Sequence, residues 1–334
     1  MKIAALGRTE YLYKSILELK KRGFEVVLII TCQEAPEYKK GVEDFRSLAK
    51  KIGADFLNTE KINNQKVKQL IKKDQPQIAI SVNWRTLVSE EIIKSFPLGI
   101  INAHCGALPR YRGNAVPNWA IIRGEKEIVV TLHLMQKELD AGPILLKKKM
   151  FLTDQTYIGD IYKFIFDNLP DMFNQAIKGL AGGKIKPQKQ SKNPKLSLRC
   201  YPRVPKDSEI NWQKSAIEIS RLVRASAEPL FGAYTFLDGR KLKIWRAYPE
   251  KSNFPYLGIH GQVAERRKKE GEVAIITGNG FLVIEKAEIE NQGKKEATDI
   301  IKSNRDRLGF DIMTAIEKLE QKIKNFIKKK ELKL

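Results

Sequence analysis

The first half of the chain alternates short apolar runs with longer segments in which apolar positions recur at helical spacing. Residues 2–6 and 24–31 (FEVVLIIT) are continuous apolar runs, which are typical of strands buried on both faces. Between them, residues 9–22 have near-helical apolar spacing, and Gly23 ends the predicted helix. Further helices are predicted over 41–52 and 64–73, and further strands near Phe56 and over 77–82 and 99–104.

This alternation of strands and helices predicts the fold class of the first domain, which we place at residues 1–180. Strands that alternate with helices form a doubly wound, mostly parallel, Rossmann-like α/β sheet. The apolar segments 128–135 (IVVTLHLM) and 143–150 (PILLKKKM) follow, and we expect them to pair as a hairpin at the sheet edge.

The composition and the pattern of the sequence change after the first domain. Residues 181–205 are rich in basic residues and contain no acidic ones, and they include Pro and Gly-Gly, so they indicate a linker or an exposed crossing. Residues 206–310 contain short strands separated by Asp-Gly and Asn-Gly turns, which predicts a small β-barrel-like (OB-like) second domain. Residues 311–334 form a predicted Lys-rich amphipathic helix.

Charge and cysteine content bear on the binding partners and the cellular compartment of the protein. The 334 residues include 61 basic and 39 acidic ones, for a net charge of +22, which attracts phosphate-bearing partners but also fits a solvated Lys-rich surface. No run reaches the roughly 18 apolar residues of a membrane span. The three cysteines are far apart in the sequence and show no disulfide or zinc spacing, so we expect a cytoplasmic protein.

Three polar residues follow predicted strands closely enough to suggest chemistry. His104, in INAHCGALPRYRG (101–113), lies at the carboxyl end of a strand, the edge where open α/β sheets bind ligands. Asn102 lies two residues earlier and therefore on the same side of that strand. Asp140, in ELDAGPI (138–144), precedes a Gly-Pro turn. Taken singly, each has a structural explanation, and His133, inside an apolar strand, is interpreted as a packing residue.

The two motifs together resemble the folate-dependent formyltransferase family. The pattern N-x-H-x-G-x-LP-x-YRG, followed by LDAGPIL, is similar to that family's site, and residues 208–247 are similar to the second domain shared by methionyl-tRNA and aminosugar formyltransferases. The resemblance implies transfer of the formyl group of N10-formyltetrahydrofolate to an amine, with no metal. It places the catalytic trio on Asn102, His104 and Asp140. Gly106-Ala107 stands where the family often has Ser-Leu.

The proposed chemistry requires these residue types. Asn102 and a protonated His104 can donate to the oxyanion that forms when an amine attacks the formyl carbon. Histidine is also suited to move the proton from the attacking nitrogen. If Asp140 is ionised within hydrogen-bond distance, we expect it to raise the pKa of His104.

The resemblance also suggests binding residues. The pterin slot of the family corresponds to NWRTLV (83–88) and QKELDAG (136–142) in this chain. The expected folate contacts are Thr86, Leu87, Val88, Gln136, Leu139 and Gly142. The expected acceptor contacts are Arg110, Arg112 and Asn114, with simple solvation of the arginines as the alternative.

The acceptor amine is open between two classes. Residues 112–135 are similar to formyltransferases that act on nucleotide-linked amino sugars, which we favour. Methionyl-tRNA formyltransferases carry a long basic insertion after the second strand, whereas residues 31–45 here contain four acidic residues and two lysines and should repel a phosphate backbone. The net charge and the basic segment 181–205 suit tRNA, the alternative partner. An inactive folate- or RNA-binding relative is a third hypothesis, and a homodimer is possible.

Overall fold

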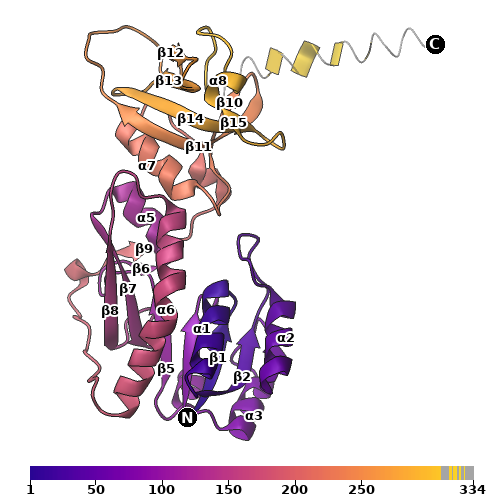
Figure 1. The fold of residues 1–334 in the computed structure, drawn as a ribbon, viewed down its shortest axis with the longest axis vertical. Coiled ribbons are helices and arrows are strands. Elements are labelled where there is room, and N and C mark those ends of the chain that lie inside the picture. The colour runs from indigo at the N-terminus through magenta and orange to yellow at the C-terminus, as the bar shows by residue number, and fades with distance from the viewer. Residues whose placement is uncertain (310–315, 318, 322, 325–326, 328–334) are drawn as a thin grey trace. The chain divides into compact units, whose positions relative to one another are not determined.

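The computed structural model describes residues 1–309 and, in the tail, residues 316–317, 319–321, 323–324 and 327. Within this part, the chain divides into two compact units. The first comprises Met1–Ala120 and Gly124–Arg203, and the second comprises Ile121–Arg123 and the residues from Val204 onward (Figure 1). Most of the predicted C-terminal helix over 311–334 lies outside the described residues.

The first unit is built on a seven-stranded sheet with the order β3-β2-β1-β4-β5-β7-β8. Strands β1 to β5 are parallel, and β7 and β8 join them as an antiparallel hairpin at the edge. The predicted mostly parallel α/β sheet and its edge hairpin are therefore confirmed. The strands are β1 (Lys2–Gly7), β2 (Glu25–Thr31), β3 (Asp55–Asn58), β4 (Ile78–Val82), β5 (Ile100–His104), β7 (Glu127–Leu134) and β8 (Ile144–Phe151).

Helices cover both faces of this sheet, because the inner strands are apolar on both sides. On one face, α3 and α4 pack on a core that includes the fully buried strand residues Leu28, Ala79 and Ile100. Elsewhere in the unit, α1 packs against α6. The helices are α1 (Glu10–Lys21), α2 (Val42–Ile52), α3 (Gln65–Asp74), α4 (Glu90–Lys94), α5 (Val116–Arg123) and α6 (Ile158–Ala181).

The sequence pattern did not predict the longest of these helices, α6. Pro170 lies inside it, and proline normally interrupts a helix because it lacks an N–H donor. The helix persists because it buries a long apolar stripe, in which Ile161, Leu169 and Phe173 are inaccessible or nearly so. Tertiary packing therefore outweighs the local penalty of the proline.

The basic segment after α6 adds strand pairs to the first unit. The backbone of Gln188 pairs with that of Ile144 through two hydrogen bonds of 2.8 Å. Further along, β9 (Arg199–Cys200) pairs in parallel with β6 (Arg112–Gly113). The segment therefore runs against two parts of the first unit, the hairpin at Ile144 and the loop at β6.

The second unit is an antiparallel sheet on which α7 (Ala216–Ser226) and the short α8 pack. The sheet has the order β10-β11-β14-β13-β12, and the short β15 pairs with β14. Residues 306–309 bridge the two edge strands of this sheet. Gly309 N donates to Phe236 O of β10, and Leu308 N donates to Gly261 O, just before β12. These contacts give the sheet a barrel-like closure. The elements are β10 (Ala233–Leu237), β11 (Arg240–Glu250), β12 (Val263–Arg267), β13 (Glu272–Ile276), β14 (Phe281–Ile289), β15 (Lys295–Glu296) and α8 (Ala297–Ile300).

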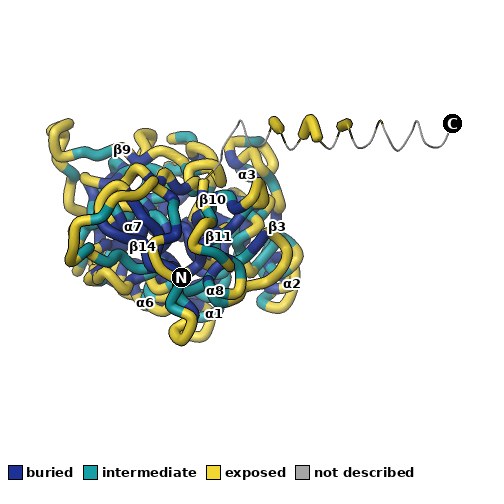
Figure 2. Tube along the Cα trace, turned by 90° about the horizontal axis from the view of Figure 1, so that it is seen from above, coloured by how far each residue is buried: buried dark blue, intermediate teal, exposed yellow. Residues whose placement is uncertain are grey.

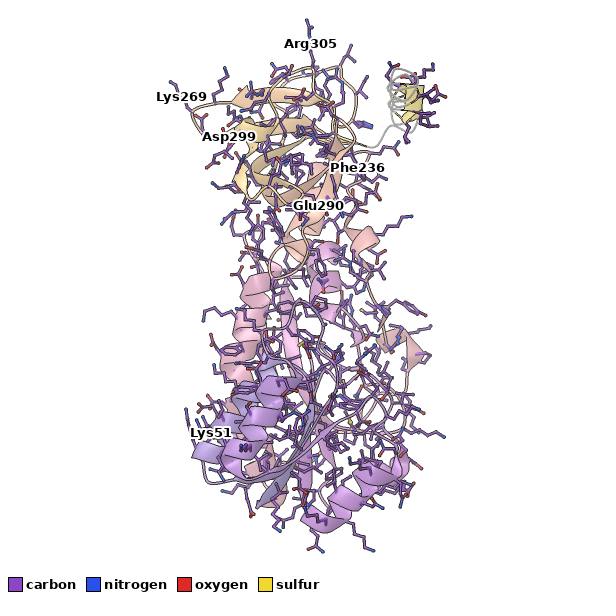
Figure 3. All side chains as sticks on the ribbon, turned by 90° about the vertical axis from the view of Figure 1, so that its right-hand side faces the viewer. Lys51, Phe236, Lys269, Glu290, Asp299 and Arg305 are labelled. Atoms are coloured by element: carbon purple, nitrogen blue, oxygen red, sulfur yellow. The ribbon has the colours of Figure 1, made fainter. Side chains whose placement is uncertain are left out.

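Burial follows this architecture within each unit. Figure 2 shows buried residues along the strands and exposed residues along the connecting loops. In the second unit, Lys269 and Arg305 project from loops into solvent (Figure 3).

Candidate active site

The candidate site forms where β5 ends. Asn102 and His104 lie on this strand, and His104 is 7% exposed. One ring nitrogen of His104, Nδ1, lies 3.5 Å from Asp140 Oδ2. The other, Nε2, lies 2.6 Å from the carbonyl oxygen of Tyr111, and because a carbonyl can only accept, Nε2 carries the hydrogen. Tyr111 O therefore fixes the orientation of the ring, and in the neutral ring Nδ1 has a free lone pair that faces the Asp140 carboxylate.

Asp140 is held between the two loops that close the site. It is 9% exposed, it follows β7 in the hairpin, and its backbone has φ +50°. The backbone N–H of Gly113 donates to its Oδ2 at 2.9 Å. Two residues later, position 142 requires glycine, because a Cβ there would lie 1.7 Å from Leu134 O. The hairpin loop thus turns tightly and presents the carboxylate toward His104.

His133, interpreted from the sequence as a packing residue, is part of this cluster. It is 2% exposed, and its Nδ1 donates to Leu134 O at 3.0 Å. Its Nε2 lies 3.1 Å from Asn102 Nδ2 and 3.6 Å from Asp140 Oδ1. In the neutral ring, Nε2 accepts from the Asn102 amide, which fixes the orientation of that amide. The register that places His133 opposite Asn102 is a tertiary feature that the sequence did not reveal.

The pKa of His104 is lowered, which corrects the expectation that Asp140 raises it. Asp140 does favour the charged form of His104, but burial of the ring outweighs it, and the pKa of His104 is lowered. Burial also acts to raise the pKa of Asp140, yet His133, His104 and the Gly113 N–H together lower it to about 2. The site therefore combines an ionised carboxylate with a histidine that is neutral near pH 7.

The expected folate residues divide into exposed and buried ones. Leu87 and Leu139 are 61% and 40% exposed, although large apolar side chains are usually covered. Gln136 and Thr86 are exposed, and Thr86 accepts a hydrogen bond from Trp84 Nε1. The remaining candidates, Val88 and Gly142, are buried, and the Leu87 carbonyl accepts from Asn63 Nδ2 at 3.0 Å. The two exposed leucines lie on two different loops of the first unit.

The expected acceptor residues are engaged to different degrees. Arg110 is half exposed and pairs with Glu125 at 3.0 Å. Arg112 instead donates to Gln190 Oε1 at 2.9 Å. Asn114 is exposed, and its backbone N–H donates to Cys200 O. The structure thus brings Asn102, His104 and Asp140 together, while the three acceptor candidates lie on the adjoining loop without entering that cluster's hydrogen bonds.

The described residues contain neither a clustered set of metal ligands nor a helix that could span a membrane. Among these residues there is no group of three or more side chains suited to hold a metal ion. Nor does any helix in the described ranges have the length and apolar character to cross a membrane.

Sequence comparison identifies the family. The formyl transferase family profile matches residues 1–177, and the profile of the formyl transferase C-terminal domain matches residues 204–305. The chain belongs to the formyl transferase family. A methionyl-tRNA formyltransferase of Caldanaerobacter subterraneus subsp. tengcongensis is 32% identical over 252 residues, which cover 74% of this chain and 80% of that protein. The suspected resemblance is confirmed at the level of the family.

Solved structures of two N-formyltransferases and of HypX share the fold. WlaRD, a sugar 3N-formyltransferase crystallised with dTDP and 5-N-formyl-THF, is 20% identical with a TM-score of 0.61, covering 88% of this chain and 99% of its own. An N-formyltransferase from Helicobacter canadensis, in complex with folinic acid and dTDP-3-aminofucose, is 18% identical with a TM-score of 0.61, covering 85% of this chain and 98% of its own. HypX from Aquifex aeolicus, in complex with tetrahydrofolic acid, is 19% identical with a TM-score of 0.60, covering 91% of this chain. This chain spans 47% of the HypX chain, about half its length.

Proposed function

We propose that this formyltransferase passes the formyl group of N10-formyltetrahydrofolate to the primary amine of a nucleotide-linked amino sugar. The observation that carries the formyl-transfer step is the cluster of Asn102, His104 and Asp140 at the end of β5, with carboxylate and imidazole 3.5 Å apart. The exposed Leu87 and Leu139 offer apolar surface for the pterin of the carrier. The carrier supplies the formyl group, and the protein supplies orientation and proton transfer.

The residues suggest a defined order of proton movement. The attacking amine must lose one proton, and N10 of the carrier must gain one when the C–N10 bond breaks. His104 is neutral at rest, so it can accept the amine proton at Nδ1 beside the ionised Asp140. Its Nε2–H, held by Tyr111 O, can be transferred to an oxyanion or to N10 when substrate replaces that carbonyl.

Asn102 completes the site as a fixed hydrogen-bond donor. Its amide nitrogen has two hydrogens, and one of them is used on His133 Nε2 at 3.1 Å. The second hydrogen remains for the developing oxyanion. A donor that is already oriented needs no reorganisation during the reaction, which is the main source of such stabilisation.

The preference for an amino-sugar acceptor rests on the loop between β2 and α2. Its four charged residues are Glu34, Glu37, Lys39 and Lys40, so it has no net positive charge. Lys40 is further paired with Asp44 at 2.7 Å. Such a loop offers little attraction to an RNA backbone. Methionyl-tRNA is the second candidate acceptor, favoured by the 32% identical relative and by the net charge of +22.

A competition between acceptors tests the proposal. The purified protein is incubated with N10-formyltetrahydrofolate and either dTDP- and UDP-linked amino sugars or methionylated initiator tRNA, and products are analysed by mass spectrometry. Formylated sugar is expected, and His104→Ala should abolish it. Formylation of the tRNA alone would transfer the assignment to the second candidate, and formylation of neither acceptor would reject both.

A further inference from the structure

The side chain of Gln190 connects the basic segment after α6 to the catalytic loop. Its Nε2 donates to two backbone carbonyls of the hairpin loop, Asp140 O at 2.8 Å and Gly142 O at 2.7 Å. Its Oε1 accepts from Arg112 Nη2 at 2.9 Å. The amide therefore uses both of its N–H groups and its oxygen, each on a residue of the site or next to it.

The same segment holds the other side of the site through β9. The backbone at and just after β6 donates to this segment twice: Arg112 N to Leu198 O at 2.9 Å and Asn114 N to Cys200 O at 3.0 Å. Between these two residues lies Gly113, whose N–H donates to the Asp140 carboxylate. Gly113 has φ +101°, and a Cβ there would lie 2.4 Å from Cys200 O, so only glycine permits this close approach.

We propose that Gln190 is a positioning residue for formyl transfer, which sets the Asp140 carboxylate at its working distance from His104. This inference rests on the proposed function of the same site. The carbonyl of Asp140 belongs to a residue with positive φ, so its direction determines where the carboxylate points. Two donors from one amide hold that carbonyl and the Gly142 carbonyl together. Arg112 then ties the amide to the strand that also donates to the carboxylate.

Glutamine fits this place, and glutamate does not. Glutamate would keep the size and the acceptor for Arg112, but it has no donor and would place an anionic oxygen against two carbonyl oxygens. Gln188 provides a matched control, because its side chain is exposed two residues away and only its backbone pairs with Ile144. Gln190→Glu and Gln188→Glu therefore change the net charge equally, but only the first removes the donors.

Steady-state kinetics of the intact protein with the acceptor that it formylates tests the role. In Gln190→Glu and Gln190→Ala we expect kcat to fall by about 10²-fold, since a displacement of about 1 Å remote from the reacting atoms has such effects. The fall in kcat should exceed any change in KM for the acceptor, because Gln190 holds the carboxylate loop through two hydrogen bonds and the expected acceptor contact Arg112 through one. The acid limb of the kcat–pH profile should move to lower pH, because a displaced carboxylate stabilises protonated His104 less. The Gln188 variants should match the wild type.

A second measurement does not depend on turnover. Hydrogen–deuterium exchange of the peptide containing residues 136–142 should be faster in the Gln190 variants than in the Gln188 variants. If exchange, kcat and the pH profile of Gln190→Ala and Gln190→Glu all equal those of the Gln188 controls, the role is refuted. If the wild type formylates no acceptor, the proposed function fails, while unequal exchange would still show that Gln190 holds this loop. A Gln190→Glu variant that does not fold leaves Gln190→Ala to decide.

Discussion

Replacing Asp140 with asparagine tests the electrostatic reasoning for the site most directly. The substitution is close to isosteric and keeps an oxygen for the Gly113 N–H, which donates to Oδ2 at 2.9 Å. It removes the negative charge that lies 3.5 Å from His104 Nδ1 and 3.6 Å from His133 Nε2. Any loss of activity therefore reports on charge more than on shape.

The expected magnitude follows from the geometry. Two unit charges about 4 Å apart interact by about 4 kcal/mol at an effective dielectric constant near 20. If the transition state retains roughly half to all of that interaction between Asp140 and protonated His104, its loss costs about 2–4 kcal/mol, or roughly 30- to 1,000-fold in kcat. The same change should lower the already lowered pKa of His104 further, because burial, His133 and Arg112 all lower it and, of the groups that act on the ring, only Tyr111 O is then left to raise it.

The assay is steady-state formyl transfer between about pH 5 and pH 9, with Glu127→Gln as control, because Glu127 is a carboxylate at the exposed start of the same hairpin. Asp140→Asn should lower kcat and move the acid limb of the profile to lower pH. A loss below about tenfold with an unmoved acid limb would refute the assignment.

The stability of the fold gives a second check on Asp140. Its pKa is lowered from 3.8 to about 2, so the ionised carboxylate contributes about 2 kcal/mol to the free energy of unfolding above about pH 4. This contribution is lost as the pH falls toward 2. Urea unfolding of Asp140→Asn should lack this pH dependence.

Two further predictions concern packing. Gly106→Ala places a Cβ 2.6 Å from His104 Nε2 and 2.3 Å from Tyr111 O, so kcat should fall by about tenfold or more while the circular dichroism spectrum is retained; wild-type kcat would contradict the tight fit. Phe173→Ala empties a fully buried position in α6 and should lower the free energy of unfolding by about 3–5 kcal/mol in urea, whereas Phe254→Ala, at a 64% exposed position, should change it by less than about 0.5 kcal/mol. Equal effects of the two phenylalanines would show that α6 does not pack as described.

The parts of the fold that were predictable are those with a local signal. Continuous β-branched runs such as 24–31 mark strands that are buried on both faces, and the structure places β2 there. Asn102 and His104 also had a local signal, because they lie at the carboxyl end of a predicted strand, where open α/β sheets bind ligands. Asp140 was added to them through the resemblance of two motifs to the family, because it follows an antiparallel strand. The helix containing Pro170 was not predicted, because its stability comes from the surface it buries rather than from its own propensity.

The contacts that complete the site were not predictable, because they join residues that are far apart in sequence. Gln190 is 50 residues from Asp140, and His133 is 31 residues from Asn102. Within its own stretch, Gln190 is one polar residue among many in a basic segment that indicated a linker. The register of β5 and β7 brings His133 to the site, and the path of the segment after α6 along the first unit brings Gln190 there.

The charge state of the site favours a particular class of nucleophile. Asp140 has a pKa of about 2 and accepts a hydrogen bond from the Gly113 N–H, so the carboxylate is ionised near pH 7. Burial keeps His104 neutral, so a proton can enter the site only by moving onto the ring, where the carboxylate then stabilises it. An acceptor that attacks as a neutral amine generates that proton as the new C–N bond forms. The site is therefore poised to gain one positive charge during the reaction, which suits formylation of nitrogen with transient protonation of His104.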